Sequence, residues 1–172
     1  TAPPSPAQEK SAGKYGNALH VWDLQSRKHL QKIELGAEQQ MVLELRPAHD
    51  PRKAFGFVGV VISLKDLSSS IWQWYHDDVT GTWAARKVIE IPAEPADADD
   101  LPPLLKGFGA VPPLVTDIAL SVDDSALYVS CWGTGELKRF DVRDPHNPVE
   151  TGSVHLGGIV RRAPHPAAGP VN

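Results

Sequence analysis

The sequence predicts an all-β protein built from β-propeller blades, with about two and a half four-stranded blades in its 172 residues. Three observations lead to this prediction. Short runs that alternate apolar and polar residues, typical of half-buried strands, recur along the chain. The 16 Pro and 14 Gly residues indicate frequent turns. A unit of four strands in about 42 residues also occurs more than once, as it does in propeller repeats.

The clearest unit covers residues 115–158. Its apolar positions alternate, and its turns are rich in Asp, Ser, Gly and Pro, which suit tight backbone conformations. Strands are expected over residues 115–121, 126–131, 136–142 and 149–156.

An earlier unit has the same order, and half a unit precedes it. We expect its strands over residues 41–46, 55–62, 70–76 and 82–91, and those of the half unit over 18–24 and 29–35. The third strands align on Trp22, Trp72 and Phe140, which are 50 and 68 residues apart. The longer interval contains a Pro- and Asp-rich insertion at about residues 92–114, long enough to form a rim feature or a lid.

The predicted organisation is therefore a partial propeller domain over residues 15–160 between two Pro- and Ala-rich ends. Residues 1–14 are predicted to be a linker or disordered, and residues 161–172 a loop that leads to a further blade. A closed propeller needs four to eight blades of about 40 residues, so this chain is too short for one. A self-contained β-sandwich of about ten strands is the alternative; the ordered repeat favours the propeller.

Composition excludes several classes of protein. The formal net charge of −4 argues against nucleic-acid binding, which requires a basic surface. No apolar run approaches the roughly 20 residues of a membrane span. The single cysteine, Cys131, excludes an internal disulfide. We expect a cytoplasmic protein, with the periplasm as the alternative if a preceding segment carries a signal peptide.

Five segments resemble a known family over roughly residues 13–172. They are KYGNALHVWDL, EQQMVLELRPAHDPRKAFGFVGVV, TWAARKVIEIPAEPADADDLPPLL, PPLVTDIALSVDDSALYVSCWGTGELKRFDVRDP and GSVHLGGIVRRAPHP. They are similar to the middle third of the selenium-binding protein family, whose bacterial members are also described as methanethiol oxidases. The resemblance implies a seven-bladed propeller, of which this chain is a central segment.

The resemblance also implies a reaction. Family members oxidise methanethiol with O₂ and water to formaldehyde, hydrogen sulfide and hydrogen peroxide, in a copper-dependent manner. The partners expected are therefore a small thiol and O₂. Selenium binding in related members is attributed to an N-terminal cysteine outside this segment, so no selenium-binding residue is assigned here and the role is not transferred to Cys131.

Copper favours neutral imidazole ligands, which makes histidines the candidate metal ligands. His49, in the loop sequence RPAHDP, is the first candidate because Leu45-Arg46-xx-His49-x-Pro51 matches a pattern of the family. The alternative is that its ring caps a turn. His165, in APHPAAGP, is a second and weaker candidate. His155 is expected at an exposed strand edge, and no catalytic residue is assigned.

Two other functions stay open at this point. The first is a non-catalytic propeller that binds selenium or a protein partner, since propellers are general scaffolds. The second is a propeller hydrolase or lactonase with a divalent metal in its central channel. Copper content and thiol-dependent peroxide release would separate the oxidase from both.

Overall fold

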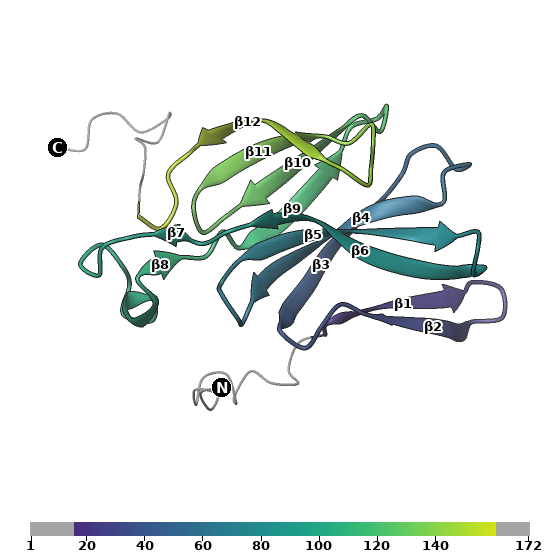
Figure 1. Ribbon diagram of the computed structural model, residues 1–172, viewed down its shortest axis with the longest axis horizontal. Helices are drawn as coiled ribbons and strands as arrows, with labels where there is room; N and C mark the ends of the chain where they lie inside the picture. Colours follow the sequence, from purple (N-terminus) through teal and green to yellow (C-terminus); the bar gives the residue numbers. More distant parts are fainter. Residues whose placement is uncertain (1–15, 161–172) are drawn as a thin grey trace.

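The computed structural model describes residues 16–160, which form two four-stranded antiparallel sheets, a two-stranded hairpin and a short two-stranded ribbon (Figure 1). The predictions for residues 1–14, the loop at 161–172 and His165 lie outside the described residues. The strands are β1 Ala18–Asp23, β2 Lys28–Glu34, β3 Gln39–Pro47, β4 Phe55–Ser63, β5 Ser69–Asp77, β6 Thr82–Ile91, β7 Glu94–Pro95, β8 Ala110–Val111, β9 Val115–Leu120, β10 Ala126–Cys131, β11 Glu136–Asp141 and β12 Val149–His155.

Each four-stranded sheet is a meander in which neighbours along the chain are also neighbours in the sheet. One sheet has the order β3-β4-β5-β6, and the other the order β12-β11-β10-β9. All ten predicted strands are present with ends within two residues of those expected, so the all-β prediction is confirmed. The helical content of the described part is one 3₁₀ turn, η1 Lys106–Phe108, and no helix there is long and apolar enough to cross a membrane.

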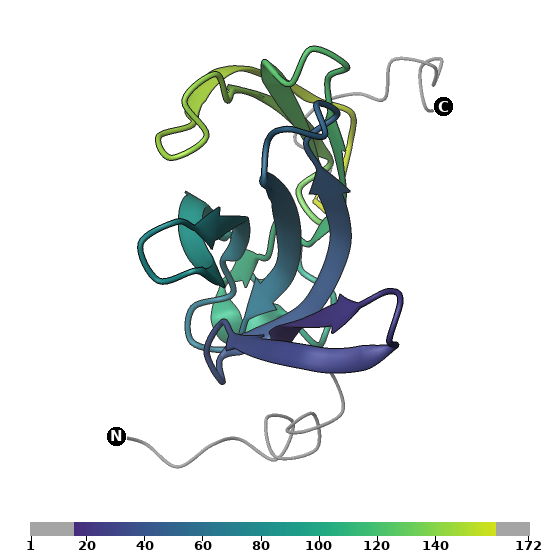
Figure 2. The same ribbon diagram turned by 90° about the vertical axis from the view of Figure 1, so that its right-hand side faces the viewer.

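The three main units lie one after another in space. Figure 2 shows the β1–β2 hairpin at one end, the β3–β6 sheet in the middle and the β9–β12 sheet at the other end. Strand β9 lies against both β3 and β4. The hairpin is joined to β6 by the Gln31 side chain, whose amide donates to the Trp83 carbonyl at 2.6 Å and accepts from the Trp83 N–H at 3.1 Å.

Strand β4 is buried along nearly its whole length, which explains why its sequence FGFVGVVIS is continuously apolar rather than alternating. Gly56 is required within it because a Cβ there would lie 2.3 Å from the Trp74 ring and 2.5 Å from the Arg46 carbonyl oxygen. Apolar side chains of both sheets form one core between them. That core consists of Phe57, Ile71, Ile89, Ile91, Val115, Ile118, Leu120, Leu127, Val129, Cys131, Phe140 and Val142.

The segment between β6 and β9, called the excursion below (residues 92–114), carries the β7–β8 ribbon and η1. It is attached to the β9–β12 sheet by backbone hydrogen bonds from Trp132 N–H to the Leu114 carbonyl and from Gly133 N–H to the Pro113 carbonyl. Val111 of the excursion is fully buried. These contacts bring the base of the excursion to the turn between β10 and β11.

Candidate functional site

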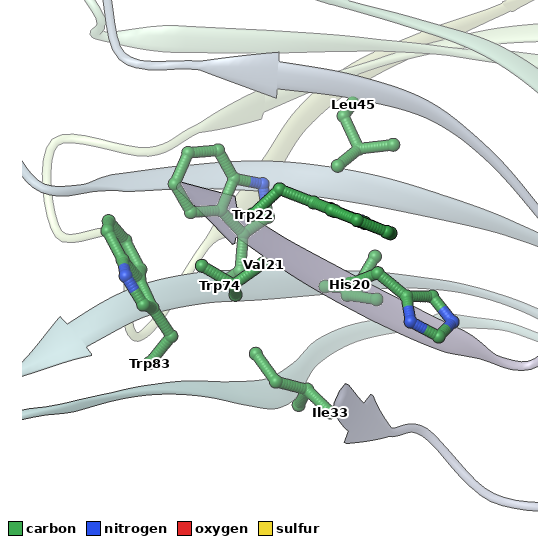
Figure 3. A pocket seen from close by; sticks show the side chains of 8 residues that line it. His20, Val21, Trp22, Ile33, Leu45, Trp74 and Trp83 are labelled. Carbon is green, nitrogen blue, oxygen red and sulfur yellow. The ribbon is translucent and has the colours of Figure 1, made fainter. Parts of the chain in front are cut away.

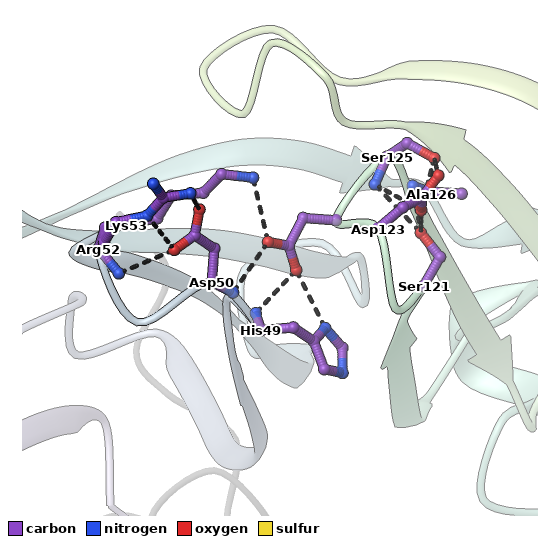
Figure 4. Close-up of polar contacts among 9 residues, drawn as sticks. His49, Asp50, Arg52, Lys53, Ser121, Asp123, Ser125 and Ala126 are labelled. Atoms are coloured by element: carbon purple, nitrogen blue, oxygen red, sulfur yellow. Dashed lines mark hydrogen bonds and ion pairs between the residues drawn. The ribbon is translucent and has the colours of Figure 1, made fainter.

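His49 lies in the loop between β3 and β4 and contacts the turn between β9 and β10 of the next sheet (Figure 4). Its backbone N–H donates to Asp124 Oδ1 at 2.8 Å, and its ring Nδ1 lies 3.0 Å from the same oxygen. Lys53 Nζ contacts Asp124 Oδ2 at 3.1 Å, and the Asp50 N–H contacts it at 3.4 Å. The carboxylate of Asp124 therefore contacts three residues of the loop between β3 and β4.

The Asp124 side chain is only 2% exposed, and its backbone has a φ of 59°. Asp and Asn tolerate this left-handed conformation better than most residues, which fits an Asp at the turn. Burial by itself would raise the pKa of Asp124, but hydrogen bonds from the His49 N–H, the His49 ring and Lys53 outweigh it and lower that pKa to about 2. The carboxylate is thus a charged group in a buried position, satisfied by donors of the neighbouring loop.

This lowered pKa predicts acid sensitivity of the contact between the two sheets. A carboxyl whose pKa is lower in the folded state stabilises the fold fully above its unfolded pKa of about 3.9, and the contribution is lost as pH falls towards the folded value. Asp124, with a folded pKa of about 2, should therefore contribute ~2 kcal/mol at neutral pH that disappears between about pH 4 and pH 2. Thermal unfolding midpoints measured from pH 6 to pH 2.5 should fall more steeply for the wild-type protein than for Asp124→Asn, and parallel curves would contradict the assignment.

The contact with Asp124 also determines which nitrogen of the His49 ring stays available to a ligand. With Nδ1–H donated to the carboxylate, the lone pair of a neutral ring is on Nε2, on the far side of the ring (Figure 4). The side chain is 46% exposed. Metal-ligating histidines commonly donate their other ring nitrogen to a carboxylate in this way, which fixes the tautomer. The same contacts also satisfy the turn-cap interpretation, so the geometry allows both.

Within residues 16–160, His49 does not belong to a group of three metal-ligating side chains. The other histidines have separate partners. His20 Nδ1 and His29 Nε2 lie 3.0 Å apart on the exposed face of the hairpin, His76 pairs with Asp78, and His146 Nδ1 contacts the buried Gln73 at 2.7 Å. Among the described residues, the ring contact of His49 is therefore with Asp124, and the ring contacts of these other histidines are with other side chains.

A second cluster was missed from the sequence. Glu94, Glu136 and His155 each place a ligand atom within 4.8 Å of the other two. His155 was expected at an exposed strand edge, but its side chain is 33% exposed and faces two carboxylates. The sequence signal was weak because the three residues come from β7, β11 and β12, and the two-residue strand β7 was not predicted.

Cys131 is a buried free thiol. The residue is 1% exposed within the core. Burial, and secondarily the charge of Glu136, raises the pKa of the Cys131 thiol to about 12. Burial and the raised pKa therefore disfavour the thiolate form of this side chain.

An apolar cavity of about 260 Å³ lies between the hairpin and the β3–β6 sheet (Figure 3). The Nε1–H of Trp74, a residue of its wall, is buried and has no hydrogen-bond partner within residues 16–160. The wall of the cavity is thus aromatic and aliphatic. Its lining residues are Leu19, His20, Val21, Trp22, Ile33, Leu45, Trp74 and Trp83.

Comparison with known proteins shows the family of this chain. The model of the family described as 56 kDa selenium binding protein matches residues 6–171. This chain belongs to that family. The resemblance read from the sequence is thereby confirmed.

The chain is also similar in sequence to individual named proteins. The chain is 41% identical over 156 residues to a methanethiol oxidase of Danio rerio, covering 91% of this chain and 31% of that protein. It is 40% identical over 154 residues to a methanethiol oxidase of Homo sapiens, with 89% and 30% covered. It is 37% identical over 151 residues to selenium-binding protein 2 of Mus musculus, with 88% and 29% covered.

A solved structure supports the blade arrangement. The X-ray structure of a hypothetical selenium-binding protein from Sulfolobus tokodaii matches with a TM-score of 0.86 and 55% sequence identity, covering 92% of this chain and 34% of that one. The two four-stranded meanders and the half unit are therefore blades of a family member, as predicted. The chain spans about 30% of the length of the named relatives it matches.

Proposed function

We propose that this chain is a central propeller segment of a copper-dependent methanethiol oxidase, and that His49 contributes one ligand to the copper through Nε2. The observation that carries the ligand assignment is the buried Asp124 carboxylate, which lies 3.0 Å from His49 Nδ1 and leaves Nε2 for a metal. Relatives named methanethiol oxidase, about 40% identical, support the reaction class.

His49 and Asp124 fit the role of a copper ligand and its supporting carboxylate, but they do not form a complete site. A neutral imidazole nitrogen is a ligand that copper favours, and Asp124 is a positioning residue that sets both the tautomer and the orientation of the ring. One imidazole does not make a copper site, and within residues 16–160 His49 belongs to no group of three ligating side chains, so further ligands would come from other parts of the complete protein. Bound copper would supply the one-electron chemistry that allows O₂ to accept electrons from the thiol substrate.

The overall reaction is balanced as CH₃SH + O₂ + H₂O → HCHO + H₂S + H₂O₂. Carbon is oxidised to the aldehyde, O₂ is reduced to peroxide, and the C–S bond breaks to release sulfide. Within this segment, His49 would hold the metal and Asp124 would keep the Nδ1 proton in place. Cys131 has no part in the scheme because its thiol is buried and its pKa is raised to about 12.

The test is His49→Asn in the complete protein. Asparagine can present an N–H close to the position of Nδ1, so the contact with Asp124 is retained, while the nitrogen at the Nε2 position is removed. We expect copper content and peroxide release from methanethiol to fall by at least about 100-fold, with little change in the thermal unfolding midpoint. His76→Asn is the matched control, because the ring of His76 pairs with the exposed Asp78.

Two results would count against the proposal. Unchanged copper content and activity in His49→Asn would remove His49 from the site. A wild-type protein that takes up selenium from selenite, but contains no copper and releases no peroxide or sulfide from methanethiol, would favour the alternative of a non-catalytic selenium-binding propeller. That alternative is suggested by the relative named selenium-binding protein 2.

A further inference from the structure

Two histidine rings from different strands of the β1–β2 hairpin contact each other directly. Nδ1 of His20, on β1, lies 3.0 Å from Nε2 of His29, on β2, and the two rings are tilted by 50° with centroids 5.1 Å apart. Both residues are exposed. Neutral imidazole is the commonest metal ligand in proteins, so two ring nitrogens that meet at one point form a candidate metal site.

A β-bulge places both rings on the same face of the hairpin. The strand register is regular up to Val21 and then shifts by one residue. Trp22 consequently lies opposite His29 rather than Leu30. Successive side chains of a strand point to opposite faces, so without the shift His29 would project from the face opposite to that of His20. Bulges commonly re-aim a side chain in this way, and the contact between the rings depends on this one.

Trp22 restricts one of the two rings. Its indole contacts the His29 ring edge-on, with centroids 5.1 Å apart and an interplanar angle of 66°. A ring that is already restricted by an aromatic neighbour loses less conformational entropy when it binds a ligand. The hairpin therefore presents a partly preorganised pair of nitrogens.

The lysines beside the two rings have acidic neighbours. Lys32 of β2 forms an ion pair with Glu34 at 2.5 Å. Lys28, which precedes His29 in the sequence, lies opposite Asp23 in the strand register. Neither lysine therefore adds a net positive charge next to the rings that would repel a cation.

The separation of the two ring nitrogens fits a metal chelate. Nitrogens bound to one ion at about 2.0 Å lie about 2.8 Å apart at a right angle and about 3.3 Å apart in a tetrahedron. The observed 3.0 Å lies between these values. The alternative is one proton shared between the rings, with one nitrogen donating and the other accepting. A metal ion would replace that proton and take the lone pairs of both nitrogens.

The position of the hairpin in a blade favours access to the two rings. Strands β1 and β2 correspond to the third and fourth strands of the β3–β6 blade, which are its outer strands. The blades of a propeller surround a central channel and diverge towards the outside. The two rings thus belong to the outer part of the propeller, where an ion from solution can reach them.

We propose that His20 and His29 bind a divalent copper ion, with water in the remaining positions. Imidazole suits copper, zinc and nickel, and Cu²⁺ forms the most stable complexes of the divalent metals in this series. The site is separate from the copper ligand proposed at His49, which lies in the loop between β3 and β4. With two protein ligands and an open coordination sphere, it is an exchangeable site through which the protein takes up copper from solution.

The experiment is titration of the complete protein with Cu²⁺ by isothermal calorimetry, followed by electron paramagnetic resonance of the bound ion. We expect one Cu²⁺ at this site, with nitrogen couplings from two imidazoles. His20→Gln and His29→Gln should each weaken its affinity by more than about tenfold, because the advantage of two linked ligands is lost. Both positions are exposed, so the unfolding midpoint without added metal should stay near that of the wild type.

Controls separate this site from the proposed oxidase function. His76→Gln, which removes a ring that pairs with the exposed Asp78, should retain the site, and so should His49→Asn. Copper binding that is absent in the wild type, or equal in the wild type and both ligand variants, would overturn the proposal and leave the pair with a shared proton only. Loss of the ion only in His49→Asn would also overturn it. Oxidase activity enters none of these readouts, so the two proposals can fail independently.

Discussion

Replacing Gly133 with alanine should destabilise the complete protein by at least about 3 kcal/mol, because overpacking against fixed backbone is costly. A Cβ at this position would lie 2.0 Å from the Pro112 carbonyl oxygen and 3.1 Å from that of Pro113. Both obstacles are backbone atoms of the excursion, and the Gly133 N–H donates to Pro113 at 2.8 Å. Relief of the clash would therefore require breaking the attachment of the excursion to the blade.

Gly152→Ala is the matched control for this variant. Gly152 lies in β12, and a Cβ there would have no atom within 4 Å. The control should leave the thermal unfolding midpoint nearly unchanged, while Gly133→Ala should lower it by several degrees or give insoluble protein. Similar midpoints for the two variants would show that the excursion can shift away from the β10–β11 turn at little cost.

Replacing Asp124 with alanine should cost about 3 kcal/mol, since removal of one partner from a buried charged network leaves the others unsatisfied. The lost interactions are those to the His49 N–H and ring, the Asp50 N–H and the Lys53 ammonium. All of these donors belong to the preceding blade, so the variant should loosen the contact between two blades. Chemical unfolding of the complete protein would measure the loss.

Asp124→Asn provides the comparison. Asparagine tolerates the φ of 59° at this position and keeps one acceptor oxygen, but it has no charge. Its unfolding midpoint should fall between those of the wild type and Asp124→Ala. An alanine variant as stable as the wild type would mean that the loop around His49 is held by its own packing, and Asp124 would then lose its positioning role.

The strands were predictable because their signal is local. Alternating residues in VTDIAL, the apolar run FGFVGVVI and the Asp-, Gly- and Pro-rich turns each determine a few neighbouring backbone conformations. The strand ends consequently lie within two residues of those expected. The β7–β8 ribbon was not predicted, since two-residue strands have no periodicity and their pairing depends on the blade beneath.

The candidate site residues were less predictable because the residues that they contact are distant in the chain. His49 was a candidate because of its motif, but its partner Asp124 is 75 residues away and looked like an ordinary turn residue. His155 looked like an edge residue until the register placed it opposite Glu136 and the excursion brought Glu94 beside it. Sequence pattern indicates which residues share a strand face; it does not indicate which loops of neighbouring blades meet.

The attachment of the excursion has a consequence for proteolysis. Its base is held by the buried Val111 and by the backbone contacts around Gly133, whereas Leu104 and Phe108 near its tip are 79% and 58% exposed. Exposed loop tips are preferred cleavage sites. A cut near Phe108 would divide the polypeptide between two blades, yet each new end would stay anchored, the first through β7 and the second through β8. The nicked molecule would migrate as two pieces under denaturing conditions and as one particle under native conditions.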